Sequence, residues 1–503
     1  MENNVVAQFK ELQKKLVPLW RSIRQITPDE QTIVVVPSIS LDASLGGAMQ
    51  AYEERFLFLL LLLRQPRARV IYVTSQTILP SIADYYLGLL PGVIPSHARK
   101  RLFLLSPLDG SKGSLTAKIL ERPRFIQQIR ALIPNPDLAH LVPYNTTELE
   151  RELAVRLGIP MYGADPDLAH LGTKSGCRKL FEQEGVPHAF GYEDLTTLEG
   201  LCSAIAGIRK KRPGVSEVIV KLNEGVSGEG NAKVKLEGLP VSGSAGEPAA
   251  IEKAVRAMSF ELPEAAFDGY MAKFAKRGGV VEERIVGEEV RSPSVQMRVT
   301  PLGELQVLST HDQMLGGPSG QSYLGARFPA DSAYADFIGR EGARIGKRLA
   351  REGVIGRFAV DFIVARNQGG EWSSYAIEIN LRKGGTTHPF LTLQFLTDGN
   401  YDQEKNLFTA PDGRPKFFVA SDHVESPLFR GLSPDDLFDI AVRHRLHFDQ
   451  ARQVGVVFHM ISALSESGRV GLTAVEESHQ QATALYDKVV AALEEEADAA
   501  RRS

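Results

Sequence analysis

The chain has 503 residues, a formal net charge of -3 at pH 7 and 43% hydrophobic residues. This length is too great for one hydrophobic core and predicts roughly two to four domains. A net charge near zero gives no electrostatic reason to expect nucleic acid or an anionic membrane as a partner, whereas small anionic ligands stay open. The two cysteines, Cys177 and Cys202, provide neither a disulfide framework nor a zinc spacing, so a reducing cytoplasm fits best.

The apolar run FLFLLLLL at residues 56–63 is the one segment that suggests a membrane. The run between Arg55 and Arg64 is too short to cross about 30 Å of hydrocarbon as a helix. We therefore predict a buried core helix and no membrane partner. The amino terminus carries Lys10 and Glu11 where a signal peptide would need its apolar region, so no export signal is expected.

The first third of the chain alternates apolar strand candidates with helical patterns. The strand candidates are residues 32–36, 69–74, 101–105 and 139–143. This alternation predicts a parallel, Rossmann-like sheet. Because no G-x-G-x-x-G turn opens a helix there, a dinucleotide site is poorly supported and we expect a substrate or scaffold domain.

The residue pattern changes after Gly163. We predict a helix at about residues 173–184, ended by Gly185, and then two strands at residues 217–222 and 232–236. The loop between these strands is rich in glycine, which predicts a glycine-rich hairpin.

This hairpin is suited to phosphate. Gly225, Gly228 and Gly230 would let backbone N–H groups approach a polyphosphate, and Lys221 would add a positive charge beside them. The alternative is an ordinary turn with a solvated lysine, which is the more frequent outcome for three glycines alone. No Walker A loop is present, so other motifs must decide between the two.

A second hairpin is predicted within residues 356–385. A two-residue turn at Gly369-Gly370 would place Asp361 opposite Glu378, with Asn380 and Arg382 on the same strand face as Glu378. Directly opposed carboxylates lie about 5 Å apart and repel, which a stable hairpin tolerates only if a cation or a proton neutralises them. Oxygen ligands of this kind suit Mg²⁺. A surface hairpin with solvated acids is the alternative, but the flanking runs are too apolar for it.

The segment VVEERIVGEEV, residues 280–290, is a strand followed by two acidic pairs around Gly287. Its backbone can present a base-pairing edge to adenine, and a carboxylate one step further can accept hydrogen bonds from the ribose hydroxyls. Taken alone, the segment also fits a charged loop.

Taken in order, these signals resemble the ATP-grasp enzymes. They are Lys174 at a helix start, Lys221 before the glycine hairpin, E-x-x-I-x-G-x-E at residues 282–289, Asp361, and E-I-N-L-R at residues 378–382. The resemblance covers about half of the chain. It implies an ATP site clamped between two α+β subdomains, and most such enzymes are carboxylate–amine ligases.

The resemblance also implies a role for each matching residue. It implies ATP and two Mg²⁺ ions as cofactors, with Mn²⁺ as a substitute. The implied phosphate-binding residues are Lys174, Lys221, Gly225, Ser227, Gly228 and Gly230; those for adenine are Glu282, Glu283 and Ile285, and that for ribose is Glu289; the implied metal ligands are Asp361, Glu378 and Asn380, and Arg382 and Lys221 are the implied catalytic residues.

A narrower resemblance involves residues 309–330 and 456–475. Both segments are similar to the peptide ligase of pheganomycin biosynthesis and its relatives, a family with a pre-ATP-grasp domain, an ATP-grasp core and its own carboxy-terminal domain. The expected fold is thus α/β and α+β multidomain: a Rossmann-like pre-ATP-grasp domain at residues 1–165, an ATP-grasp domain at 166–400 with a lid at about 215–280, and a small α+β domain at 401–503.

Five polar residues are candidate substrate contacts. His311, Asp312 and Gln313 are predicted in a polar loop that could close over an acyl group, and His388 and Arg298 are further candidates. The alternatives are a local hydrogen-bonding role for each histidine and a solvated Arg298.

The last part of the chain is predicted to contain a helix at residues 434–445, a strand at 454–460 and a closing helix at about 474–500. The closing helix carries an apolar stripe, which is more typical of core packing than of a partner site. The stripe consists of Ala482, Leu485, Val489 and Leu493.

The expected chemistry is attack of a carboxylate on the γ-phosphoryl group of ATP, followed by displacement of phosphate from the acyl phosphate by an amine. The partners are then small carboxylate and amine or peptide substrates, and self-association into a homo-oligomer stays open. The alternatives are a catalytically silent nucleotide-binding module and a kinase that acts on a hydroxyl group.

Overall fold

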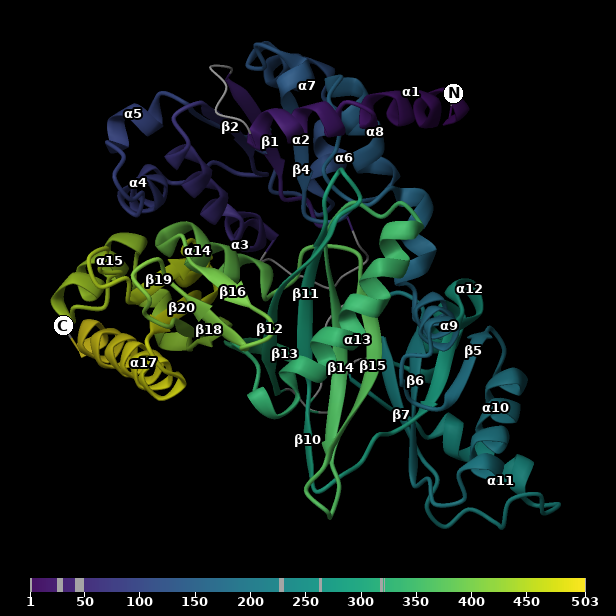
Figure 1. Cartoon of the computed structure of the whole chain (residues 1–503). Helices are drawn as coiled ribbons and strands as arrows, with labels where there is room; N and C mark the ends of the chain where they lie inside the picture. The colour runs from purple at the N-terminus through teal and green to yellow at the C-terminus, as the bar shows by residue number, and fades with distance from the viewer. Residues whose placement is uncertain are drawn as a thin grey trace.

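The computed structural model describes residues 2–24, 30–40, 49–225, 230–261, 265–316, 320 and 322–502. Its strands form three main sheets (Figure 1). A parallel N-terminal sheet lies at the top of the view, a long antiparallel central sheet runs through the middle, and a smaller antiparallel sheet, here the lateral sheet, lies at the lower right. This arrangement confirms the predicted multidomain α/β and α+β fold, whereas the domain boundaries stay a prediction.

The N-terminal sheet has the strand order β3-β2-β1-β4, and all its pairs are parallel, as predicted. One face packs against helices α1, α6, α7 and α8 through residues such as Val34 and Ile71, which are fully buried. The strands are β1 (Gln31–Val36), β2 (Ala68–Val73), β3 (Leu102–Leu105) and β4 (Ala139–Pro143); the helices of this part are α1 (Glu2–Gln13), α2 (Leu16–Arg24), α3 (Met49–Glu54), α4 (Pro80–Gly88), α5 (Pro95–Arg99), α6 (Leu115–Leu120), α7 (Pro123–Ala131) and α8 (Glu148–Leu157), with short 3₁₀ turns at Pro136–Leu138 and Pro166–Gly172.

The leucine-rich run is buried, as predicted, but it forms the 3₁₀-helix η1 (Leu57–Arg64). It packs against the other face of the N-terminal sheet and against α14 (Thr387–Thr397). Leu57, Leu60 and Leu63 are fully buried there. The resulting hydrophobic core continues into the C-terminal part of the chain, so the first and last segments share one core.

The lateral sheet has the order β5-β9-β6-β7-β8 and is antiparallel. The predicted glycine-rich hairpin is confirmed, because Lys221 of β6 pairs with Asn231 of β7. The preceding helix, α9, begins at Lys174, with the Thr173 side chain as its cap, and ends at the left-handed Gly185. The strands are β5 (Gly191–Leu195), β6 (Glu217–Leu222), β7 (Asn231–Lys235), β8 (Ser259–Phe260) and β9 (Gly279–Glu283); the helices are α9 (Lys174–Glu184), α10 (Leu198–Lys211), α11 (Glu247–Arg256) and α12 (Phe267–Arg277).

Among the described residues, the central sheet contains nine strands in the order β10-β14-β11-β12-β13-β18-β20-β19, with β15 against β14. Helices α9 and α13 (Ser332–Arg351) pack on it, and Figure 1 shows α13 crossing β14 and β15. Its strands are β10 (Glu289–Arg291), β11 (Pro293–Val299), β12 (Leu305–Gly316), β13 (Ser322–Phe328), β14 (Gly356–Arg366), β15 (Trp372–Asn380), β18 (Phe417–Glu425), β19 (Gly455–His459) and β20 (Arg469–Glu476).

The turn of the β14–β15 hairpin differs from the prediction. Asn367 and Glu371 face one another across a three-residue loop, residues 368–370, instead of a two-residue turn at Gly369-Gly370. Gly370 has a φ of +81°, which is the left-handed conformation that closes such loops. The longer loop shifts the strand register by one residue.

A bulge restores the predicted pair. Phe362 faces Ala376, but Asp361 faces Glu378, so Ile377 is the extra residue on β15. Asp361 and Glu378 therefore lie opposite one another, as predicted, through two irregularities that cancel.

The C-terminal part extends the central sheet through β18, β19 and β20. The closing helix α17 (His479–Arg502) begins later than predicted, because residues 469–476 form β20. Its predicted stripe faces the core: Ala482, Val489 and Leu493 are buried, and Leu485 packs against the same cluster. The remaining elements are β16 (Asn400–Asp402), β17 (Leu407–Thr409), α15 (Pro434–Arg443), α16 (Ala463–Ser467) and the 3₁₀ turn η4 (Pro427–Gly431).

Within the described ranges, no helix has the length and apolar character needed to cross a bilayer. This agrees with the burial of η1 among other protein segments.

We expect Leu60→Ala to destabilise the protein by about 2–5 kcal/mol, because it opens a cavity in the core that η1 shares with α14. Leu62→Ala is the matched control, since Leu62 on the same 3₁₀-helix is only partly buried. Urea unfolding followed by circular dichroism measures both. Equal loss of stability in the two variants would contradict the role given to η1.

Candidate functional site

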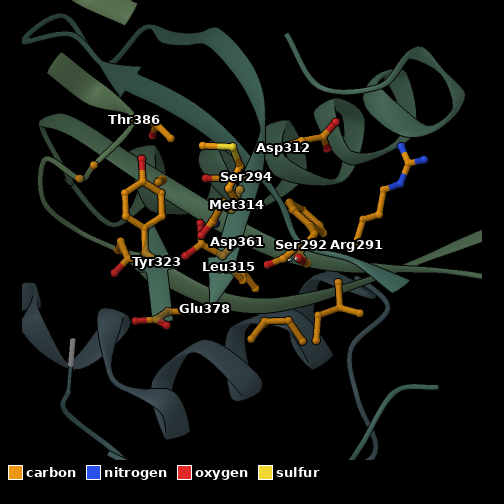
Figure 2. Close-up of a pocket in the computed structure, with 18 of the residues that line it drawn as sticks. Arg291, Ser292, Ser294, Asp312, Met314, Leu315, Tyr323, Asp361, Glu378 and Thr386 are labelled. Carbon is orange, nitrogen blue, oxygen red and sulfur yellow. Dashed lines mark hydrogen bonds between the residues drawn. The ribbon is translucent and has the colours of Figure 1, made fainter. Parts of the chain in front are cut away.

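A cavity of about 1390 Å³ lies where the lateral sheet, the central sheet and both terminal parts meet. Figure 2 draws Ser294, Tyr323, Asp361 and Glu378 around it. Most of the residues predicted for nucleotide and metal binding line this cavity: Lys174, Lys221, Gly225, Gly230, Glu282, Glu283, Ile285, Asp361, Glu378, Asn380 and Arg382.

The opposed carboxylates form the centre of the site. Burial, and then the charge of Glu378, raise the pKa of Asp361 to about 6. The side chain of Asn380 donates a hydrogen bond to Asp361 Oδ2 at 2.9 Å, and Ser294 on β11 lies opposite Asp361. Mg²⁺ is bound in proteins by oxygen atoms, and this wall offers two carboxylates and the amide oxygen of Asn380. The donor set therefore fits a magnesium ion.

Two cations lie beside these acids. Lys174 Nζ contacts Glu378 Oε1 at 2.7 Å, and Lys174 is 7% exposed. Although burial acts in the opposite direction, Lys174 and Arg382 hold the pKa of Glu378 below its usual value. Glu378 is thus charged at neutral pH, and the wall combines anionic groups suited to a metal ion with cations suited to phosphate.

A buried ion network lies on the lateral-sheet side of the cavity. Lys221 is 6% exposed and donates to Glu282, and Arg178 Nη1 also contacts Glu282 at 3.2 Å. Arg178 was not among the residues predicted from the sequence. Its position four residues after Lys174 on a predicted helix places both on one face, and this spacing is the signal that could have identified it.

The glycine-rich loop is described only in part. Gly225 and Gly230 line the cavity, and Ser227 and Gly228 lie outside the described residues. Asn223 O accepts a hydrogen bond from the N–H of Lys174 at 3.1 Å, so the start of the loop is fixed to the start of α9.

The segment between β9 and β10 connects the lateral and central sheets. Ile285 lines the cavity there, and its backbone makes no hydrogen bond with other described residues. Glu283 also lines it, although its side chain contacts Arg212 at 3.2 Å. Glu289, predicted for ribose, is not among the lining residues and pairs with Arg291 at 2.6 Å and Arg366 at 3.2 Å.

The predicted polar loop at residues 311–313 is wrong, because these residues belong to β12. His311 is fully buried among aromatic rings, including Phe328 and Phe418, and burial lowers the pKa of His311 to about 3. Its side chain therefore does not reach the cavity, whereas Asp312 and Gln313 do. Successive side chains of a strand point to opposite faces of the sheet, which explains why His311 and Asp312 differ.

Two other substrate candidates also lie outside the cavity lining. Arg298 donates to Gln306 Oε1 at 3.0 Å and lies over the Trp20 ring at 5.4 Å. His388 is 3% exposed and contacts His459 and Asp422.

One part of the cavity, here called the far end, is lined by residues that were not predicted from the sequence: Arg55, Tyr144, Tyr323 and Asp422. Arg55 and Asp422 form a buried ion pair at 2.7 Å, and Tyr144 lies beside Arg55. Burial raises the pKa of Tyr323, whose charged neighbours include Asp422, Arg55 and Asp361. Tyr323 thus connects this end to the carboxylate centre. These residues come from four distant parts of the chain, so no local pattern indicates them.

Two family models match the chain. A model described as IQCH-like ATP-grasp matches residues 166–255 and 252–404, and a model described as the PGM1 C-terminal domain matches residues 436–489. The first match contains Lys174, Lys221, Asp361, Glu378 and Arg382.

Known proteins agree with these matches. An L-propargylglycine–L-glutamate ligase from Streptantibioticus cattleyicolor is 28% identical over 451 residues, which cover 88% of each chain. An ADP complex of N5-carboxyaminoimidazole ribonucleotide synthetase has a TM-score of 0.52 at 11% identity and covers 92% of this chain and 97% of its own. A biotin carboxylase–βγ-ATP complex from Campylobacter jejuni has a TM-score of 0.52 at 14% identity, with 90% and 89% covered. The two structures support the fold, and the sequence matches indicate by homology an ATP-dependent carboxylate–amine ligase of the ATP-grasp type.

Proposed function

We propose that this ligase forms a peptide-like amide between two small amino acid-like substrates through an acyl phosphate, with ATP and Mg²⁺. The observation that carries the proposal is the cavity wall in which Asp361 opposes Glu378 beside Lys174 and Arg382. Anionic ligands for a metal and cations for phosphate are both needed to bring a carboxylate close to a polyphosphate.

The proposed reaction has two steps. A carboxylate oxygen of the first substrate bonds to the γ-phosphorus, and the bond from that phosphorus to the β–γ bridging oxygen breaks to release ADP. The amine nitrogen of the second substrate then bonds to the acyl carbon, phosphate leaves with the C–O electron pair, and the amine proton passes to solvent. Bound Mg²⁺ would neutralise charge on the phosphate oxygens.

The chain's own residues would position the reactants. Lys174 and Lys221 would contact phosphate oxygens, and Arg382 would stabilise the charge on the phosphoryl group as it moves. Asp361, Glu378 and Asn380 would hold Mg²⁺, with Mn²⁺ as a substitute. Neither step needs a covalent nucleophile on the protein.

The substrate class rests on two supports. The relative named above joins two amino acids, according to its name. At the far end of the cavity, Arg55 and the tyrosines Tyr144 and Tyr323 line the wall, which suits a substrate that carries a carboxylate. We further propose that the chain is most similar to the pheganomycin-type peptide ligases within its superfamily.

We expect Lys221→Met to weaken ATP binding by tenfold or more, because it removes a charged contact worth about 1.5–3 kcal/mol. Lys233→Met is the matched control, since Lys233 lies on the adjacent strand β7 and approaches Glu217 at 4.0 Å. Isothermal titration calorimetry with ATP and Mg²⁺ measures both. Unchanged affinity in Lys221→Met would exclude the phosphate role.

Saturating ATP with Mg²⁺ should raise the melting temperature of the wild-type protein, because the ligand binds only the folded chain. Glu378→Gln should lose most of this increase, since it removes one of the opposed metal ligands with little change in volume. Glu371→Gln, an exposed change in the turn of the same hairpin, should keep it. A full increase in Glu378→Gln at low Mg²⁺ concentration would contradict the metal assignment.

With a productive acid and amine, chosen by screening amino acids and peptides, we expect ADP, phosphate and amide to form in equal amounts. With the amine withheld, hydroxylamine should trap the activated acid as a hydroxamate. A kinase would instead produce ADP and a stable phosphoester, and a silent binding module would produce none of these.

Arg382→Ala should reduce amide formation by about a hundredfold while ATP binding changes little, because its contact strengthens as charge develops on the phosphoryl group. Arg340→Ala, which removes an exposed arginine paired with Asp336, is the control. Undiminished turnover in Arg382→Ala, or amide formation without ATP cleavage, would rule out the mechanism.

A further inference from the structure

Three buried side chains converge beside the far end of the cavity. His388 comes from the first turn of α14, Asp422 from β18 and His459 from the end of β19. Each is 3% exposed. His388 Nε2 lies 3.0 Å from His459 Nε2 and 3.2 Å from Asp422 Oδ1, and His459 Nε2 lies 2.7 Å from the same oxygen.

Hydrogen bonds alone do not satisfy these three ring and carboxylate atoms well. If both Nε2 atoms carry hydrogen, both donate to Asp422 Oδ1, but the two N–H groups then crowd one another at 3.0 Å. If one Nε2 carries no hydrogen, its lone pair either faces the lone pairs of Asp422 Oδ1 or competes with that oxygen for the hydrogen of the other Nε2. A buried imidazole in this state is costly.

A metal ion satisfies all three atoms at once. Two imidazole nitrogens and one carboxylate oxygen are donors that Zn²⁺ accepts, at bond lengths of about 2.0–2.2 Å. Such bonds in a tetrahedral site separate the donors by roughly 3.3 Å. The observed separations of 3.0 and 3.2 Å lie near this value, and the separation of 2.7 Å between His459 and Asp422 is shorter.

The surroundings orient the carboxylate in the manner of a metal site. Arg55 Nη1 donates to Asp422 Oδ2 at 2.7 Å, which leaves Oδ1 directed toward the two rings. The positive charge of Arg55 in turn lies over the rings of Tyr52, at 5.0 Å, and Tyr144, at 5.6 Å. Outer hydrogen bonds of this kind fix the geometry of metal ligands.

We propose that His388, Asp422 and His459 bind one divalent transition-metal ion, with Zn²⁺ the best fit to the donors. The site is distinct from the magnesium ligands Asp361 and Glu378, which offer oxygen atoms. Three protein donors leave a fourth coordination position, and because Asp422 lies on the cavity wall, water or a substrate group can fill it. This inference does not depend on the proposed amide chemistry.

The test uses the full chain without a histidine tag, purified from cells grown with added Zn²⁺. Elemental analysis should find about one zinc per chain. After removal of zinc with a chelator, the protein should take up one equivalent of Co²⁺ and develop visible absorption bands of the intensity typical of tetrahedral coordination. A folded wild-type protein that retains no zinc and takes up neither Zn²⁺ nor Co²⁺ at micromolar concentration would overturn the proposal.

Variants assign the ion to these ligands. His459→Gln and Asp422→Asn should reduce the zinc content at least tenfold. His444→Gln is the matched control, because His444 contacts a single carboxylate, that of Glu496 at 2.9 Å, and should keep the ion. Glu378→Gln should also keep it, which separates this site from the magnesium site. Full zinc content in a His388→Gln/His459→Gln double variant would likewise overturn the assignment, and if the variants fail to fold, the Co²⁺ titration of the wild type decides alone.

Discussion

The repulsion between Asp361 and Glu378 is the constraint on which the rest of the site depends. A β-hairpin brings these carboxylates together, and burial makes their coexistence unfavourable unless positive charge lies nearby. Lys174 supplies part of that charge from a different element, the first turn of α9. The position of α9 is fixed in turn by the N–H of Lys174, which donates to Asn223 of the glycine-rich loop. The electrostatics of one strand pair thus determines how the lateral and central sheets meet.

Much of this arrangement could be predicted from the sequence, because its signals are local. Periodicity predicted the four parallel strands, and the stop residue Gly185 marked the end of α9. The β14–β15 hairpin shows the limit of such reasoning. The loop length and the bulge at Ile377 are each invisible to alternation alone, and the predicted pair was correct because the two shifts cancel.

Features that depend on distant segments could not be predicted. The polarity of H-D-Q at residues 311–313 suggested a loop, but β12 continues through them because β11 and β13 pair with it on both sides. His311 is uncharged within an aromatic core, where a neutral imidazole resembles another ring. Arg55 and Asp422 are 367 residues apart, and their pairing follows only from the packing of the first and last parts of the chain.

The shared core around η1 has a consequence for how this protein can change over evolution. Because its leucines pack against both the N-terminal sheet and α14, and the same core extends to β20 and α17, the two ends of the chain form one packing unit interrupted in sequence by the nucleotide-binding segment. Recombination that exchanged only one end would join surfaces that were not selected together. A change in the shape of the far end of the cavity is therefore more accessible through coordinated substitutions in both ends of the chain than through exchange of one end.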